Sequence, residues 1–269
     1  MQGKWINSAE NFSKSLDIFS KLGDKDHKIL TLICMGTSLR MLDQFRDSYK
    51  YFNDALNLIR GQGPSDMEGW ILGKIGNIHT LLHQNREAVD SYNLSLSLCE
   101  NISNEKERLY HQGWIIGELG HVHRKMGLIE ESIDYYNKSL KIFENLNDPS
   151  KISWISGELG DAYKYQGRYY EARDVFIKAL NLLKSRGKLD PMGMVNLAEV
   201  HLMAGSFKGA IQDYSEALKL IEESGDLSNE AKILCRFGDT YRRIGEYQSA
   251  RIYLKNSLEI ARRINDRDQ

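Results

Sequence analysis

The chain has 269 residues, 41% of them hydrophobic and 27% charged, with 36 basic and 37 acidic side chains. This composition is typical of a globular protein, and the balanced charge argues against a general nucleic-acid-binding protein, which would normally carry a basic surplus. No apolar run reaches the roughly 18 residues of a membrane span and the first residues do not form a signal peptide, so we expect a cytoplasmic protein without membrane contact.

An internal repeat organises the sequence. The segment at 114–120 returns almost unchanged at 154–160, and a third copy lies at 70–76. The last residue of each copy belongs to a series of anchors spaced by roughly 40 residues, namely Gly36, Gly76, Gly120, Gly160, Ala198 and Gly238. After every anchor a small residue follows at +12, a large apolar one at +16, a small one at +19 and leucine at +20. Spacings of three and four residues predict helices, and small residues facing large ones indicate closely packed helix pairs.

The predicted elements begin with a leading half repeat at 3–22, which reads as a turn at 3–5 followed by the second helix of a pair. Six full helix pairs follow at about 26–60, 66–101, 106–145, 149–185, 190–223 and 228–264. The last residues, 265–269, repeat the pattern of the linker at 23–27. A stack that starts and stops within a repeat leaves apolar faces on its end helices uncovered. We therefore expect an excised part of a longer protein or a chain that stacks on a partner, which includes end-to-end self-association through the truncated terminal repeats. The alternative is a degenerate native terminus.

Turn and cap residues support these boundaries. Glycine is expected to end the first helix of a pair in the left-handed conformation at Gly127, Gly167, Gly205 and Gly245. Repeats 1 and 2 have Asp43 and His83 at this place instead. Asp148 and Asp190 each precede a proline, which predicts an N-cap followed by a first-turn proline. The third proline, Pro64, also falls where a first helix should begin.

The pattern resembles the tetratricopeptide repeat. The fourth repeat carries the family's residues at every position compared, Gly160, Tyr163, Gly167, Tyr169, Ala172, Phe176 and Ala179. The longer period is similar to the 40-residue subclass found in Pins-type polarity scaffolds and in bacterial peptide-sensing and signalling regulators. The resemblance implies an all-α, right-handed superhelical solenoid of antiparallel helix pairs, forming one domain over 1–269. It also implies that a protein or peptide segment binds in a concave groove lined by the first helices.

Groove positions in the family are 2, 5, 9 and 12 of each first helix, with the anchor as position 8. The residues that we assign to the groove are Trp70, Gly73, Asn77, Trp114, Gly117, Glu118, His121, Arg124, Trp154, Gly157, Glu158, Asp161, Lys164, Glu199, Arg236, Asp239 and Arg242. A glycine inside a helix costs about 1 kcal/mol relative to alanine, so those at position 5 require a reason. Two interpretations stay open. Each glycine forms a pocket beside an indole for a ligand side chain, or it makes room for an indole to pack against the next repeat.

No catalytic or metal-binding constellation accompanies these residues. Three cysteines without a closely spaced pair exclude a disulfide framework and a thiolate zinc site. His79, His123 and His201 share one packing position of the repeat and do not converge as metal ligands. The sequence therefore predicts a protein- or peptide-binding scaffold with no cofactor, no metal and no catalysis of its own. The alternative is a ligand-sensing regulatory arm of a larger signalling or transcription protein.

Overall fold

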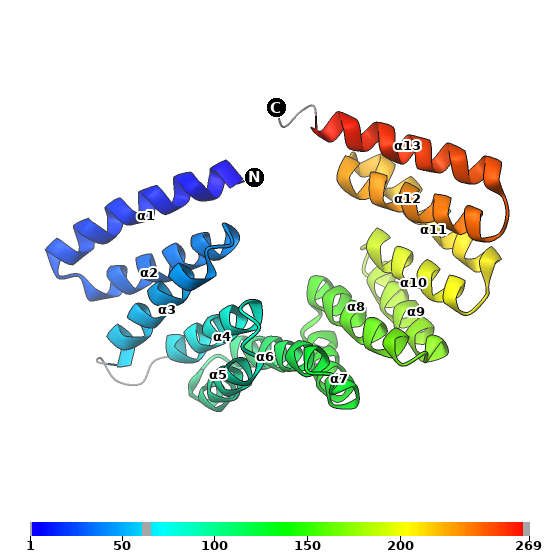
Figure 1. The fold of residues 1–269 in the computed structure, drawn as a ribbon. Helices are drawn as coiled ribbons and strands as arrows, with labels where there is room; N and C mark the ends of the chain where they lie inside the picture. Colours follow the sequence, from blue (N-terminus) through cyan, green and yellow to red (C-terminus); the bar gives the residue numbers. More distant parts are fainter. Residues whose placement is uncertain (1, 61–65, 266–269) are drawn as a thin grey trace. The chain divides into compact units, whose positions relative to one another are not determined.

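The computed structural model describes residues 2–60 and 66–265, and over these ranges the chain is helical without any strand (Figure 1). The helices are α1 Gln2–Leu22, α2 Lys25–Met41, α3 Phe45–Arg60, α4 Asp66–Leu81, α5 Asn85–Leu98, the 3₁₀ helix η1 Cys99–Asn101, α6 Glu105–Lys125, α7 Ile129–Leu146, α8 Pro149–Tyr165, α9 Tyr169–Ser185, α10 Pro191–Met203, α11 Phe207–Ser224, α12 Leu227–Arg243 and α13 Tyr247–Asn265. The all-α solenoid of antiparallel helix pairs is thus confirmed. Pro64 and the linker residues 266–269 lie outside the described part.

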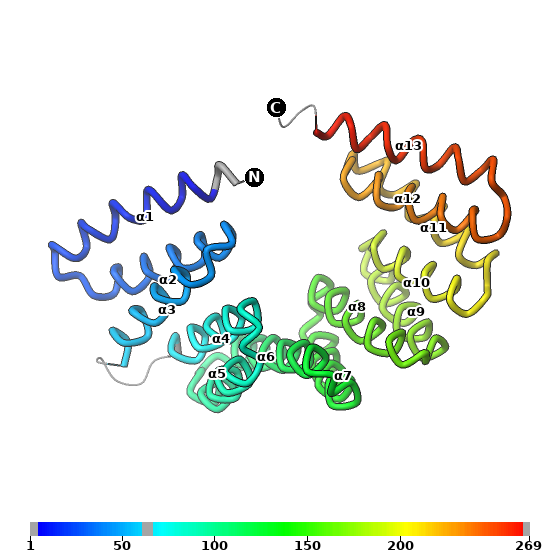
Figure 2. Tube along the Cα trace, viewed as in Figure 1, coloured from blue at the N-terminus to red at the C-terminus, as the bar shows by residue number. Residues whose placement is uncertain are grey.

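The helices divide into two compact units, Met1–Leu146 and Asn147–Gln269. Within each unit, each first helix packs on the second helix of its pair, which in turn packs on the first helix of the next pair (Figure 2). A single domain over 1–269 stays a prediction. Among the described helices, none combines the length and the apolar composition that a membrane crossing requires.

The predicted helix ends are present. Gly127, Gly167, Gly205 and Gly245 have φ angles of 81°, 73°, 77° and 84°. Asp43 and His83 adopt the same left-handed conformation, with φ of 58° and 60°, although they carry side chains. Asp148 accepts a hydrogen bond from the backbone N–H of Lys151 at 3.0 Å, and Asp190 caps α10 in the same way. The turn predicted at 3–5 is wrong: α1 is helical from Gln2, because one glycine weakens a helix by only about 1 kcal/mol.

The anchor glycines allow the two helices of a pair to approach closely. A β-carbon on Gly76 would lie 2.6 Å from the ring of Tyr92 at position +16. The small residues at position +19 lie at the same crossing, where Ser95 donates a hydrogen bond of 2.6 Å to the backbone carbonyl of Gly69. Ser139 makes the equivalent bond to Gly113. The repeating small and large residues of the sequence are therefore the contact surface between the helices of a pair.

Candidate functional site

The three tryptophans predicted to line the groove have different surroundings. Trp114 on α6 is only 7% exposed, and a β-carbon on Gly73 of α4 would lie 2.8 Å from its ring and 2.6 Å from Ile115. For this pair the indole itself fills the space that the glycine leaves, which favours the packing interpretation. In contrast, Trp70 is 36% exposed, and Trp154 on α8 is half-buried.

A lysine links Trp70 and Trp114 of the first unit. The Nζ atom of Lys74 lies 4.5 Å from the ring centroid of Trp70 and 4.3 Å from that of Trp114, close enough for cation–π attraction to both. The indole N–H of Trp114 donates a hydrogen bond of 3.0 Å to Glu118. Lys74 therefore covers part of the indole faces that a ligand would otherwise contact.

The remaining predicted residues of the first unit lie on the same helices. Asn77 is half-buried on α4, and His121 and Arg124 are half-buried on α6, where Gly117 is fully buried. Three cavities in the described part of the first unit are lined by other residues, and the place of these residues in a groove stays a prediction.

A buried histidine that the sequence analysis did not single out lies beneath Trp114. His111 is 4% exposed, and its Nε2 atom lies 3.0 Å from Ser95 Oγ. Because the Ser95 hydroxyl already donates to Gly69, its oxygen accepts a hydrogen bond from the Nε2–H group of His111. Burial, together with the positive charge of Lys74, lowers the pKa of His111 to about 4. The serine at position +19 could have indicated this histidine, because the oxygen of a buried hydroxyl needs a second hydrogen-bonding partner.

In the second unit, six charged residues on α8, α10 and α12 form two groups of ion pairs that follow each other along α12, and together we call them the charged strip. Its members are Asp161, Lys164, Glu199, Arg236, Asp239 and Arg242. The Nζ atom of Lys164 lies 2.6 Å from Asp161 and 3.2 Å from Glu199, and the other oxygen of Glu199 pairs with Arg236. The Nε atom of Arg242 donates to Asp239 at 2.9 Å. All six were predicted as groove residues, and Arg236, like Asp239 and Arg242, lies on the first helix α12.

Exposure divides the charged strip into a shielded part and an accessible part. The side chains of Lys164 and Glu199 are 13% and 18% exposed, so their attraction is less screened by water than that of a surface pair. Arg236 and Arg242 are 52% and 59% exposed. Their guanidinium groups keep donors free for an external carboxylate, with which arginine forms paired hydrogen bonds.

Next to the charged strip, Gly157 on α8 faces open space. A β-carbon on Gly157 would meet only Asn196 Nδ2, at 3.9 Å, whereas the same change at Gly73 meets two side chains. The predicted groove residues Trp154 and Glu158 are half-buried on the same helix. The Nζ atom of Lys151 lies 5.1 Å from the Trp154 ring. Gly157 and Asp161 are one turn apart, so the open space adjoins the charged strip.

No group of three or more His, Cys, Asp or Glu side chains within 2–60 and 66–265 is arranged to hold a metal ion. The predicted groove residues thus offer charge, hydrogen-bond donors and apolar ring surface. These are the elements of a binding surface on a helical-repeat protein.

Comparison with known proteins agrees with this class of fold. Residues 112–185 and 191–263 match the family model of the tetratricopeptide repeat. The matched segments make up more than half of the chain, and the chain belongs to the tetratricopeptide repeat family, whose repeats serve protein interaction. No curated protein matches the sequence.

Solved structures with the same fold are distant in sequence. BtubC (BKLC) from P. vanneervenii superposes with a TM-score of 0.68 at 18% identity, covering 82% of this chain and 92% of that chain. The apo form of RapI gives 0.65 at 13% identity, covering 89% and 99%. A Rap protein in complex with Competence and Sporulation Factor gives 0.63 at 16% identity, covering 98% and 72%. At these identities the likeness establishes the fold alone.

Proposed function

We propose that this chain is a protein-binding scaffold, and that the charged strip of its second unit receives an acidic segment of a partner protein. The observation that carries the proposal is the accessibility of Arg236 and Arg242 beside the shielded Lys164–Glu199 pair. Helix α12 carries four basic side chains, Lys232, Arg236, Arg242 and Arg243, against two acidic ones, Glu230 and Asp239, whereas the whole chain has a net charge of -1. The basic surplus of this helix favours an acidic ligand.

Binding would use guanidinium groups that the fold already holds in place. Glu199 orients Arg236, and Asp239 orients Arg242, so little side-chain freedom remains to be lost when a ligand arrives. A ligand carboxylate can take the free donors of each guanidinium without displacing the internal partner. The open side of Gly157 leaves room for a neighbouring side chain of the same segment.

A peptide selection tests this proposal. A random peptide library displayed on phage is selected on the wild-type protein, and individual peptides are then titrated by fluorescence anisotropy. We expect Asp- and Glu-rich peptides whose affinity falls about tenfold or more, some 1.4 kcal/mol, in an Arg236→Ala/Arg242→Ala variant.

The matched control is Arg173→Ala, which removes an arginine from α9, a second helix of its pair, where Arg173 pairs with Asp174. This variant should bind the selected peptides as tightly as the wild type does. Peptides without an acidic bias, or peptides that bind the double variant and the wild type equally, would rule out the charged strip as the binding surface.

The second candidate function is a ligand-sensing regulatory arm. It is favoured by the shared fold with a Rap protein that was crystallised with Competence and Sporulation Factor. A sensor arm should change shape when its ligand binds. Small-angle X-ray scattering with and without a selected peptide separates the two functions, since a rigid scaffold keeps its radius of gyration and a sensor does not.

A further inference from the structure

The last helix carries an uncovered apolar stripe. Tyr247, Leu254 and Leu258 on α13 are 70%, 37% and 52% exposed, and their spacing of seven and four residues places them on one face of the helix. At position +16, which Leu254 occupies, the other five repeats bury their side chain to 2% exposure or less: Phe52, Tyr92, Tyr136, Phe176 and Tyr214. Leu254 contacts Gly238 of α12, as the +16 residue does at the other anchor glycines, whereas the rest of the stripe, Tyr247 and Leu258, stays exposed.

Basic side chains border this α13 stripe on one side. At 100° per residue, Arg251, Lys255 and Arg262 all lie within about 80° of the line through Tyr247, Leu254 and Leu258. The helix holds four basic residues, these three and Arg263, and one acidic residue, Glu259, which lies 3.6 Å from Lys255. A partner for the stripe should accordingly offer an apolar groove with an acidic rim.

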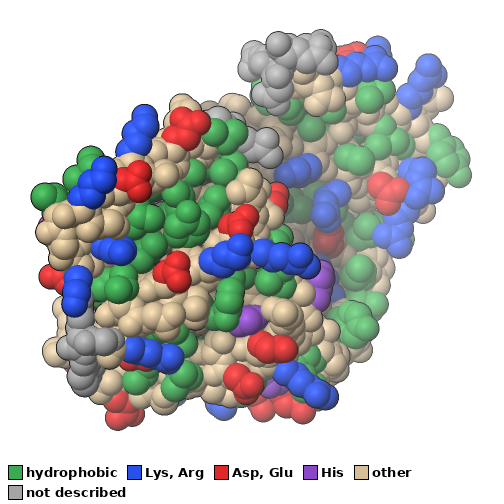
Figure 3. Space-filling model, turned by 60° about the vertical axis from the view of Figure 1, so that its left-hand side comes forward, with side chains coloured by type: hydrophobic (Ala, Val, Ile, Leu, Met, Phe, Trp, Pro, Cys, Tyr) green, Lys and Arg blue, Asp and Glu red, His purple; other side chains and the backbone are tan. Residues whose placement is uncertain are grey.

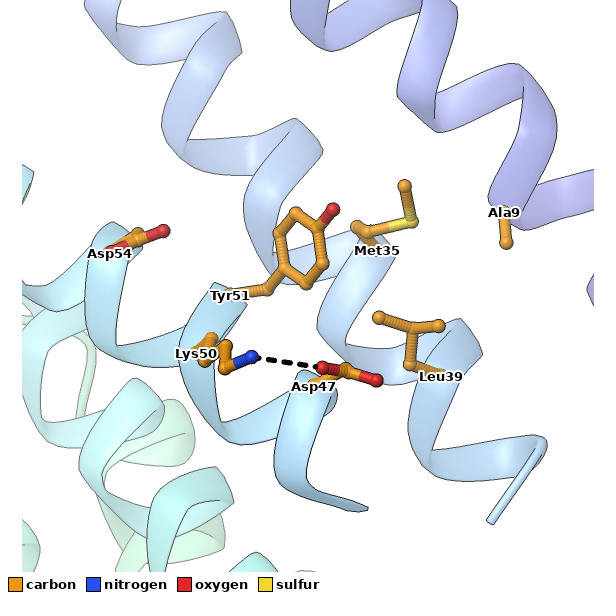
Figure 4. Close-up of a pocket in the computed structure, with 7 residues that line it drawn as sticks. All are labelled: Ala9, Met35, Leu39, Asp47, Lys50, Tyr51 and Asp54. Atoms are coloured by element: carbon orange, nitrogen blue, oxygen red, sulfur yellow. Dashed lines mark hydrogen bonds and ion pairs between the residues drawn. The ribbon is translucent and has the colours of Figure 1, made fainter. Parts of the chain in front are cut away.

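The first unit has such a groove between α1 and α3, which we call the α1–α3 groove. A cavity of about 440 Å³ is lined by Ala9 of α1, by Met35 and Leu39 of α2, and by residues of α3 that include Asp47, Tyr51 and Asp54 (Figure 4). A second cavity of about the same volume shares Tyr51 and Asp54 and continues along Leu16, Leu32 and Leu58. On the near face of the first unit, hydrophobic side chains gather between charged ones (Figure 3).

This groove is open because repeat 1 lacks a side-chain pair that other repeats have. Positions +3 and +15 after the anchor contact each other in repeats 3, 5 and 6: His123 with Tyr135 at 4.8 Å between ring centroids, His201 with Asp213 at 2.7 Å, and Tyr241 with Tyr253 at 5.3 Å. In repeat 1 these positions hold Leu39 and Tyr51, which together line the cavity. A short aliphatic side chain at +3 leaves the space that a ring occupies elsewhere.

The acidic residues on the rim of the α1–α3 groove have the same spacing as the basic residues beside the α13 stripe. Asp47 and Asp54 are seven residues apart on α3, as Lys255 and Arg262 are on α13, and either pair spans about 10 Å along its helix. Lys50 lies 3.3 Å from Asp47, and Lys28 and Asp17 line the far end of the groove. Asp54 forms no ion pair or hydrogen bond within the described part of the chain, and both cavities meet at this residue.

We propose that α13 of one copy docks into the α1–α3 groove of a second copy, with Leu258 entering the cavities and Lys255 and Arg262 facing Asp47 and Asp54. The two contact surfaces differ, so the contact is head to tail, and each copy keeps a free surface for a further copy. The contact area between two copies is small, because each copy contributes one face of a single helix or one groove. The expected affinity is therefore in the micromolar range or weaker. This contact uses neither Arg236 nor Arg242, so it is independent of the charged strip.

Sedimentation velocity between roughly 5 and 500 µM tests the proposal on the whole chain. The average mass of the wild-type protein should rise with concentration above that of the 30.9 kDa monomer. Leu258→Asp should remain monomeric, and so should Asp47→Lys/Asp54→Lys. An equimolar mixture of these two variants should form a one-to-one dimer and nothing larger, because each supplies one intact surface.

Two controls and one rescue complete the design. Leu94→Asp and Asp90→Lys change an exposed leucine and an exposed aspartate of α5, outside both surfaces, and should associate like the wild type. Mixing Lys255→Glu/Arg262→Glu with Asp47→Lys/Asp54→Lys should restore association that neither shows alone, and this second route does not depend on the leucine variant. A wild-type protein that is monomeric throughout, association that survives both surface variants, or mixtures that stay monomeric would overturn the proposal.

Discussion

Acidification should destabilise the first unit through His111. The ring is buried and neutral in the folded chain, where burial and Lys74 lower its pKa to about 4, whereas an unfolded histidine titrates near pH 6.5. The stabilising contribution is thus fully present above about pH 6.5 and is lost as the pH falls toward 4, since the unfolded chain binds the proton first. This is the usual sign for a histidine that is buried without a carboxylate partner.

The size of this loss in the free energy of unfolding follows from the folded and unfolded pKa values of His111. Between about pH 7.5 and pH 5 the unfolded state gains about 2 kcal/mol from protonation of His111, while the folded state gains almost nothing. Urea unfolding followed by tryptophan fluorescence measures this loss, because Trp70 and Trp114 both belong to the first unit. The variant His111→Gln keeps an N–H for Ser95 and removes the titration.

Comparing the wild type with His111→Gln isolates the contribution of His111 to stability, because the two proteins share all other titrating groups. The wild type should lose about 2 kcal/mol more than His111→Gln over this pH interval. Equal losses in the two proteins would refute the reasoning, and so would a histidine resonance of His111 that titrates near pH 6.5 in the NMR spectrum of the folded chain.

Three further predictions concern packing, capping and thiol reactivity. Gly73→Ala should destabilise the chain by about 1–3 kcal/mol in urea unfolding, whereas Gly157→Ala should stabilise it by about 0.5–1 kcal/mol, because only the first β-carbon meets neighbours at 2.6–2.9 Å. The reverse order would contradict the assignment of the two glycines. Asp148→Ala should cost about 1 kcal/mol in the same assay by removing the cap of α8, and no change would exclude the capping bond. Cys99 is buried with its pKa raised to about 11, so a thiol reagent near pH 8 should label the exposed Cys235 first, and a Cys235→Ser variant should lose the fast phase.

The sequence was sufficient to predict the repeats and their turns, because those depend on local chemistry. A glycine such as Gly127 or a capping pair such as Asp148 and Pro149 acts within a few residues of its own position. The prediction of a turn at 3–5 was wrong because a lone glycine does not end a helix. Asp43 makes the same local helix-end hydrogen bonds as Gly127 does, so this turn forms without glycine at a residue that tolerates the left-handed conformation.

The environment of a groove residue could not be predicted in this way. Gly73 and Gly157 occupy the same position in nearly identical motifs, yet one faces Trp114 and Ile115 and the other faces open space. The helical period fixes which face a residue occupies but does not fix how closely the neighbouring repeat approaches. His111 was missed because its hydrogen bond to Ser95 spans two repeats.

The central claim is that the charged strip selects acidic partners through Arg236 and Arg242. A charge-reversal selection tests it most directly, with one peptide library selected in parallel on the wild type and on Arg236→Glu/Arg242→Glu. We predict acidic peptides from the wild type and basic peptides from the variant, each binding its own receptor about tenfold or more tightly than the other. Libraries that converge on the same peptides for both receptors would contradict the claim.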